Sequence, residues 1–322
     1  MKRINKTEKP RGVAGGAGIS WKREFSRSWP LYMFVLPAVI LAVIFCYIPM
    51  AGLIMAFQNY KPWLGIFGSE FAGLDNFRQI FEFRESYQAI INTLIIAVSK
   101  IILGLIVPVI MALLLNEVKQ LGLKKSIQTL VYLPHFLSWV TVAGMLRDIL
   151  GLDGIVNAFL QKIGMKPVFF LGEAGLFRQI AVLSDLWKGF GFGMIVYLAA
   201  ISNIDQNLYE AAEMDGANKW QQTLYITLPG IKGSIVTVLI LSIGSFLGGG
   251  MVGSNFEQSF LMGNTVNNAT SEIIQTYAFK MGMAQGRFSY ATAVDLIQSV
   301  LSIFLVIISN QAAKKVSGEG LF

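Results

Sequence analysis

An all-α membrane protein with about six transmembrane helices is the fold class that the sequence predicts, from three observations. Hydrophobic residues make up 54% of the 322 positions and charged residues only 14%, whereas about a quarter of a soluble domain is charged. The mean hydropathy is +0.57. Six apolar windows reach the length of about 20 residues that a helix needs to cross a bilayer. Because the number of spans is even, both chain ends are expected on the same side of the membrane.

The predicted spans follow one another with polar segments between them. They cover 31–57, 89–115, 127–146, 180–201, 231–252 and 291–308. The third is the least regular, because Pro134 and His135 interrupt it and Ser138 and Thr141 make it less apolar. Residues 1–29 lack the short apolar core and cleavage site of a signal peptide. The first span is therefore expected to remain as an uncleaved anchor.

Lysine and arginine placement predicts the orientation, because cytoplasmic loops are enriched in both residues. The basic segment 1–29 carries most of the excess, so both ends are expected inside. Trp21, Phe25 and Trp29 alternate with basic residues there and predict a helix lying on the inner leaflet. The spans then form a domain over 30–313, and 314–322 is a second cytoplasmic tail. The net charge of +7 is a topology signal rather than a nucleic-acid signal.

Between the fourth and fifth spans lies a polar, helix-forming insert over 205–230. Asp205 is placed to cap a helix that continues through Glu210, and Gly216 permits a sharp turn. A second helical segment over 218–225 is expected to stop at Pro229. The insert therefore predicts a helix-turn-helix elbow at the membrane surface, and its acidic residues favour burial against a partner. An amphipathic connector lying at the interface is the alternative. The candidate contact residues are Glu210, Ala211, Ala212, Asp215, Gly216, Leu228 and Pro229.

Ionisable residues inside the predicted spans are candidates for a solute pathway, because each costs a few kcal/mol in hydrocarbon unless it is paired or faces a cavity. Asp185 and Lys188 are three residues apart, so we expect them to neutralise each other on one helical face. A purely structural ion pair, with Lys100 and Lys188 reaching toward the interface, is the alternative. Aromatic residues nearby offer faces for sugar rings, although packing is their commoner role. The candidate pathway residues are Asp185, Trp187, Lys188, Tyr197 and Asp295.

The sequence lacks the residues that several kinds of catalytic and binding site require. With one cysteine and one histidine, the chain offers no disulfide, no thiolate metal cage and no Cys/His nucleophile pair. The glycines of 189–193 lie inside a span without a preceding strand, so they predict helix packing rather than phosphate binding. No metal site, cofactor site or enzyme activity is expected, and energy for any transport must come from another subunit or an ion gradient.

The elbow also carries a specific motif. Glu210-Ala211-Ala212 is followed after three residues by Gly216 and, after nine more, by Ile226-Thr227-Leu228-Pro229. This pattern resembles at every fixed position the EAA loop by which permease subunits of ATP-binding-cassette (ABC) importers dock their ATPases. Short motifs throughout the chain are similar to the MalF/UgpA-like sugar branch of type I permeases, and most of all to the LplB-type permeases for complex oligosaccharides and polysaccharides. They lie at 29–32, 47–50, 57–60, 73–77, 132–136, 187–189 and 288–293.

The resemblance implies the MetI/MalF-like fold of type I permeases in a bacterial cytoplasmic membrane. It implies four partners: a second homologous permease subunit, two ATPase subunits that bind the ATP, and an extracellular solute-binding lipoprotein. The expected function is import of oligosaccharides or polysaccharide fragments by alternating access. The outer segment 253–290 would dock the binding protein, with a helix over 270–281. The candidate docking residues are Phe256, Phe260, Asn267 and Tyr277.

Two other functions remain open at this point. A permease for a solute other than a sugar would share the EAA loop. An ion-coupled secondary transporter would show inverted repeats and broken helices at matching positions, and neither is visible in the sequence.

Overall fold

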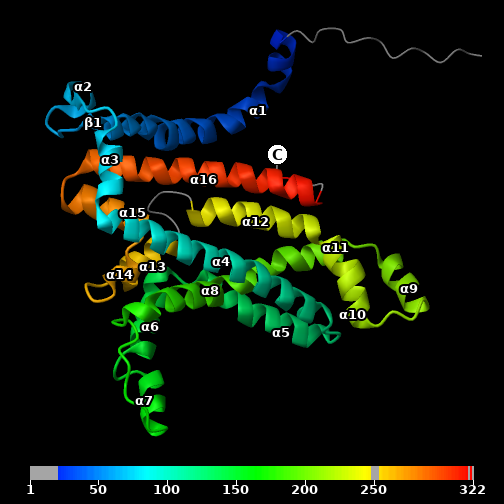
Figure 1. Cartoon of the computed structure of the whole chain (residues 1–322). Helices are drawn as coiled ribbons and strands as arrows, with labels where there is room; N and C mark the ends of the chain where they lie inside the picture. Colours follow the sequence, from blue (N-terminus) through cyan, green and yellow to red (C-terminus); the bar gives the residue numbers. More distant parts are fainter. Residues whose placement is uncertain (1–20, 248–253, 318–319, 321–322) are drawn as a thin grey trace, which may run out of the picture. The chain divides into compact units, whose positions relative to one another are not determined.

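A computed structural model describes residues 21–247, 254–317 and 320 of the chain. It divides into two compact units, residues 1–53 and 54–322. Figure 1 labels the helices along the chain. Four helices are long and apolar enough to cross a membrane, and two bent helix pairs raise this number to six within the described residues. The predicted fold class is therefore confirmed.

One apolar helical run makes up the described residues of the first unit and ends at Phe57, within the second unit. It begins with α1 (Trp21–Ala42), continues as the π-helix η1 (Val43–Tyr47) and passes into the 3-10 helix η2 (Ile48–Phe57). Pro49 lies just after the change from π to 3-10 geometry, and it has no N–H to donate to an α-helical bond. Residues 1–20 and the side chains of 21–27 lie outside the described residues, so the cytoplasmic tail and its interfacial helix stay predictions.

The second unit is built around three long helices. These are α4 (Arg84–Asn116), α8 (Ala174–Ser202) and α16 (Phe288–Ser317). The shorter α12 (Lys232–Leu247) packs against both α4 and α16, and α4 packs along α8. The helices α4, α8 and α16 extend beyond their predicted windows at both ends, and α12 is described from Lys232 to Leu247 of the window 231–252.

The third predicted span is broken into two arms. The first arm is α5 (Leu121–Tyr132) with the 3-10 turn η3 (Leu133–Phe136), and the second is α6 (Trp139–Leu150) with α7 (Ile155–Lys162). They meet at an angle of 100°. The window over 127–146 is therefore not one straight helix, and the interruption expected at Pro134 and His135 is confirmed.

Local residues explain this break. Pro134 lies in the first turn of η3, where it has no N–H to continue the bonding of α5. The Ser138 hydroxyl accepts a hydrogen bond from the Thr141 amide at 3.1 Å. It thereby starts α6 in a new direction as its N-cap.

A small residue lets α8 approach α5. Gly191 is buried, and a Cβ added to it would overlap the carbonyl oxygen of Val131. Two residues later, a Cβ on Gly193 would lie 3.3 Å from the ring of Pro108 in α4. Gly191 and Gly193 thus serve helix packing, as the position of the run in a span predicts.

The segments at the N-terminal end of α4 form a cap of short elements. The strands β1 (Gln58–Asn59) and β2 (Glu70–Phe71) pair antiparallel around α2 (Gly65–Gly68), and α3 (Asp75–Glu82) follows. After residues 248–253, which are not described, come α13 (Ser254–Met262), α14 (Asn268–Ser271), α15 (Ile274–Phe279) and the π-turn η5 (Lys280–Ala284). The helix expected over 270–281 is broken after Ser271, because Glu272 and Ile273 are extended.

Candidate functional site

The elbow begins with a self-capped helix. In α9 (Gln206–Met214), the Asp205 carboxylate accepts a hydrogen bond from the Asn207 amide at 3.0 Å. At the other end Gly216 has φ +81°, a left-handed conformation that glycine adopts without steric cost. The Gly216 amide donates to the carbonyl of Glu213 at 3.1 Å and the Ala217 amide to that of Ala212 at 2.9 Å. The predicted cap and turn are both confirmed.

The second half of the elbow is capped independently. Asn218 and Gln221 form a capping box at the start of α10 (Lys219–Gln222), with side-chain to backbone distances of 2.9 and 2.8 Å. The helix continues through the π-helix η4 (Thr223–Thr227) into α11 (Leu228–Gly230). Pro229 lies in the first turn of α11, and the 57° bend into α12 follows at Ile231. The stop is therefore two residues later than expected, because a proline is tolerated in a first turn.

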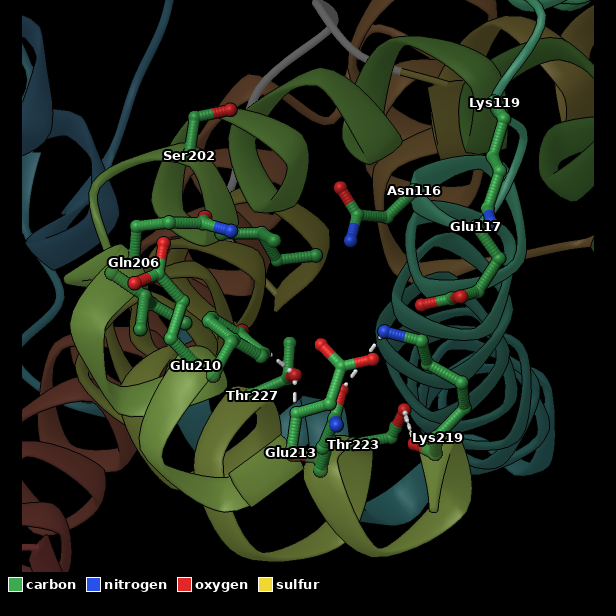
Figure 2. Close-up of a pocket in the computed structure, with 14 residues that line it drawn as sticks. Asn116, Glu117, Lys119, Ser202, Gln206, Glu210, Glu213, Lys219, Thr223 and Thr227 are labelled. Atoms are coloured by element: carbon green, nitrogen blue, oxygen red, sulfur yellow. Dashed lines mark hydrogen bonds between the residues drawn. The ribbon is translucent and has the colours of Figure 1, made fainter. Parts of the chain in front are cut away.

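The two halves of the elbow and the ends of α4 and α8 line a polar cavity of about 310 Å³. The hydroxyls of Tyr209 and Thr227 hydrogen-bond across the elbow at 2.9 Å. Figure 2 shows Glu210 and Glu213 on the α9 side of the cavity, and Lys219 and Glu117 on the other side. The cavity thus gathers carboxylates beside an ammonium group at the end of the spans.

Most of the predicted elbow contacts lie at the protein surface. Glu210, Ala211, Asp215, Gly216 and Pro229 are exposed, whereas Ala212 and Leu228 are half-buried. The sequence reasoning missed a set of large apolar side chains around them. Met214 is 88% exposed and Trp220 73% exposed, and Leu208 and Tyr225 are exposed too. Large apolar side chains in an otherwise polar insert were the feature of the sequence that could have predicted this contact surface.

A second polar group lies inside the bundle, around Lys100 of α4. Its ammonium is buried, lies 3.5 Å from a carboxylate oxygen of Asp185 and donates to Asn255 at 2.7 Å. It also donates to the side-chain oxygen of Gln258. The Gln258 amide in turn donates to the Ala181 carbonyl at 2.9 Å. This network joins α4, α8 and α13.

The expected pairing of Asp185 with Lys188 is therefore wrong. The close packing of α4 on α8 gives Asp185 a different partner, and Lys100 is enclosed rather than reaching to the interface. Lys188 instead donates to the His135 carbonyl at 2.8 Å and lies 5.5 Å from the centre of the Trp139 ring.

The other pathway candidates lie apart from this group. Tyr197 is fully buried in an apolar cluster with Met194 and Ile231, a position that favours packing. Asp295 is half-buried on α16, and none of its described contacts reaches Asp185 or Lys188. Trp187 is partly exposed beside Lys188. Their role in a solute pathway stays a prediction.

The four docking candidates divide into two pairs. Phe256 and Phe260 stack at 5.4 Å between ring centres, and Phe260 is exposed. Asn267 is 0% exposed, because its amide donates to the Leu171 carbonyl at 2.7 Å and organises the loop. Tyr277 is buried and bonds the Tyr290 hydroxyl at 3.1 Å. Burial raises the pKa of the Tyr277 phenol, and the hydrogen bond with Tyr290 raises it further.

Asn267 and Tyr277 are therefore buried within this chain, and their use for docking stays a prediction. Sequence reasoning also missed the exposed Trp63, Phe67 and Phe71 on the β1–α2–β2 segment. The feature of the sequence that could have identified them is the cluster of aromatic residues directly after the first span.

The chain is similar to known proteins over most of its length. Residues 104–318 match the family model described as "Binding-protein-dependent transport system inner membrane component". The chain is 40% identical over 311 residues to Protein LplB of Bacillus subtilis (strain 168), covering 96% of both proteins. It is 41% identical to the polygalacturonan/rhamnogalacturonan transport system permease protein YteP of the same strain, covering 91% of this chain and 90% of YteP.

A solved structure is similar over nearly the whole length. It is a chain from the crystal structure of a bacterial alginate ABC transporter in complex with an alginate pentasaccharide-bound periplasmic protein. The sequence identity is 36% and the TM-score 0.85, with 94% of this chain and 99% of that chain covered.

Proposed function

We propose, on the premise that this chain belongs to the family of binding-protein-dependent transport system inner membrane components, that its elbow transmits the work of partner ATPases to the spans. The chain is a permease subunit of a sugar or oligosaccharide ABC importer and a multi-pass protein of the inner membrane. It is a transport subunit rather than an enzyme. The elbow is α9, Gly216 and α10–α11, as described above.

The observation that carries this proposal is the construction of the elbow. Each of its two helices has its own cap, so its shape does not depend on a partner. Exposed Met214 on α9, exposed Trp220 on α10 and exposed Glu210 give the elbow both apolar contact area and a charge. A short rigid helix of this kind suits insertion into a groove on another protein.

The elbow is also mechanically connected to the spans. Leu228 packs on the cluster formed by Met194, Tyr197 and Ile231, and the cavity wall includes Glu117 at the end of α4. A displacement of α9 would therefore reach α4, α8 and α12 through packed side chains. Alternating access driven by ATPases on the cytoplasmic side requires such a connection between the elbow and the spans.

The proposed assembly has this chain beside a second homologous permease, above two ATPases that bind the ATP. Both chain ends and the elbow lie in the cytoplasm in this proposal, and 254–290 faces outward to a solute-binding lipoprotein. The similar alginate importer was crystallised in complex with a solute-loaded periplasmic protein, which supports that part. Of the four docking candidates, exposed Phe260, stacked on Phe256, is the first proposed contact. The solutes are oligosaccharides or polysaccharide fragments.

The experiment compares two matched glycines. Gly216 (φ +81°) and Gly164 (φ +83°) are both left-handed and have open space at the Cβ position. Both donate their amide to the carbonyl three residues earlier. Proline fixes φ near −65° and removes that donor, so Gly216→Pro and Gly164→Pro carry the same local penalty at different places.

We expect Gly216→Pro to abolish ATP-driven uptake and co-purification with the ATPase, at an unchanged level in the membrane. Gly164→Pro should retain both, and Glu210→Lys should behave like Gly216→Pro because it reverses the charge of the contact face. Normal uptake and ATPase retention in Gly216→Pro and Glu210→Lys would contradict the coupling role of the elbow.

A further inference from the structure

Lys188 lies in the middle of α8, beside the break between η3 and α6. Its ammonium donates to the His135 carbonyl at 2.8 Å and faces the Trp139 ring at 5.5 Å. The carbonyl is available because η3 ends at Phe136 and the chain turns by 100° there. Irregular backbone of this kind occurs at membrane depth only where protein or a water-filled cavity surrounds it.

The charge of Lys188 has no carboxylate partner among the described residues. Asp185, one turn earlier on the same helix, lies against Lys100 instead. The other ion pairs of the described part are at Asp75–Arg78 and Glu272–Lys280, in the cap. A cation within the membrane costs a few kcal/mol unless something balances it, and a carbonyl dipole with an aromatic face balances it only in part.

The surroundings of Lys188 are aromatic and open on one side. His135 stacks on Phe192 with ring centres 4.1 Å apart and planes 5° apart. Phe192 is 46% exposed, Trp187 43% and Phe136 77%. Aromatic faces contact the C–H faces of sugar rings, and an ammonium pairs with a carboxylate. A neutral sugar would satisfy the aromatic faces and leave the charge of Lys188 unbalanced.

We infer that the carried solute is an anionic oligosaccharide of uronate units, and that Lys188 determines this specificity by pairing with a sugar carboxylate during passage. The inference rests on the proposed function and adds the charge class of the substrate. The competing source of a counter-charge is a carboxylate of the second permease subunit. That alternative predicts that loss of Lys188 impairs the importer whatever the charge of the sugar.

The test uses the complete importer in proteoliposomes with its own binding protein. The anionic probes are trimers of galacturonate and of mannuronate. The neutral probes are the fully methyl-esterified forms of the same trimers, with arabinotriose and maltotriose. Each acid and its ester share one sugar backbone and differ in the charge and the methyl group of each carboxyl. Uptake is measured at saturating loaded binding protein, whose affinity for each probe is measured separately. The variants are Lys188→Met and Lys188→Arg, with Lys166→Met as a control that removes a charge from an exposed loop.

We expect wild type to import an anionic trimer faster than its ester. Lys188→Met should lower uptake of the anionic trimer by about tenfold or more, as truncation of one partner of a desolvated charge pair does. Its uptake of the neutral probes should stay within about twofold of the wild-type rate. Lys188→Arg should keep the anionic preference, and Lys166→Met should match wild type.

Three results would overturn the inference. Import of neutral probes only would refute anionic specificity while leaving the proposed function standing. An equal loss of anionic and neutral uptake in Lys188→Met would assign Lys188 to a structural pairing. Failure of the wild-type assembly to import any of the probes would remove the proposed carbohydrate function and this inference together.

Discussion

Gly191 shows how a single residue sets the distance between two helices. Because a Cβ there would overlap the Val131 carbonyl, α8 lies against the backbone of α5. Gly189, half a turn earlier, has nothing within 4 Å of its Cβ position. Adding a methyl group at each glycine therefore compares a tightly packed position with an open one within the same helix.

We expect Gly191→Ala to lower the free energy of unfolding by about 1–3 kcal/mol, as overpacking of a close contact does. Gly189→Ala should be neutral or raise it by up to about 1 kcal/mol, through better helix propensity. Thermal unfolding of the purified variants in one detergent measures both. Equal effects at the two positions would mean that the approach to Val131 does not limit packing.

The Lys100–Asp185 pair is a second residue-scale determinant of stability. Lys100→Met leaves the poorly exposed Asp185 carboxylate without its counter-ion, and breaking a buried pair in this way costs about 3–5 kcal/mol. The double variant Lys100→Met/Asp185→Asn should recover part of that loss, because no charge remains buried. A double-mutant cycle on unfolding measures the coupling, and strictly additive effects would contradict the pairing.

Local signals were sufficient to predict some of these residues and not others. Asp205 and Gly216 act on backbone a few positions away, so their cap and turn could be predicted from sequence alone. The partner of Asp185 depends on how α4 packs on α8, and no spacing within one helix reveals it. Asn267 was expected to be a docking residue, and its burial could not be predicted because its partner Leu171 is 96 residues distant.

At the scale of elements, length and hydropathy identified all six membrane segments, and the interruptions of two of them were harder to predict. Pro134 was recognised as an irregularity of the third segment, yet proline alone does not distinguish a kink from a turn of 100°. That difference comes from Ser138, which caps a new helix. The break of 270–281 after Ser271 had no glycine or proline to mark it.

The orientation of these elements is testable by labelling with a membrane-impermeant maleimide. In a Cys46→Ala background without other cysteines, Val266→Cys and Lys162→Cys should be labelled from outside intact cells. Lys219→Cys should be labelled only after permeabilisation. Asn267→Cys is the matched control, because its side chain is buried next to exposed Val266. External labelling of Lys219→Cys would overturn the cytoplasmic placement of the elbow.

At the scale of the whole molecule, the chain is expected to be inert when reconstituted alone. It has one elbow, and an importer with two ATPases needs two. Addition of the second permease, the ATPase and the binding protein should give carbohydrate uptake and ATP turnover stimulated by the loaded binding protein. Gradient-driven uptake by the single chain in liposomes without ATP would contradict this and support a secondary transporter.

The buried network around Lys100 also constrains how the protein is made. Asn255 and Gln258 follow Lys100 by 155 and 158 residues, so at about 5–20 residues per second the ribosome delivers them roughly 8–30 s later. Throughout that delay α4 carries an ammonium whose amide acceptors have not yet been synthesised. Release of α4 into lipid at once would strand this charge in hydrocarbon. We therefore expect the network to be completed only after the residues of α13 have emerged, which makes the final packing of this bundle a late event in translation.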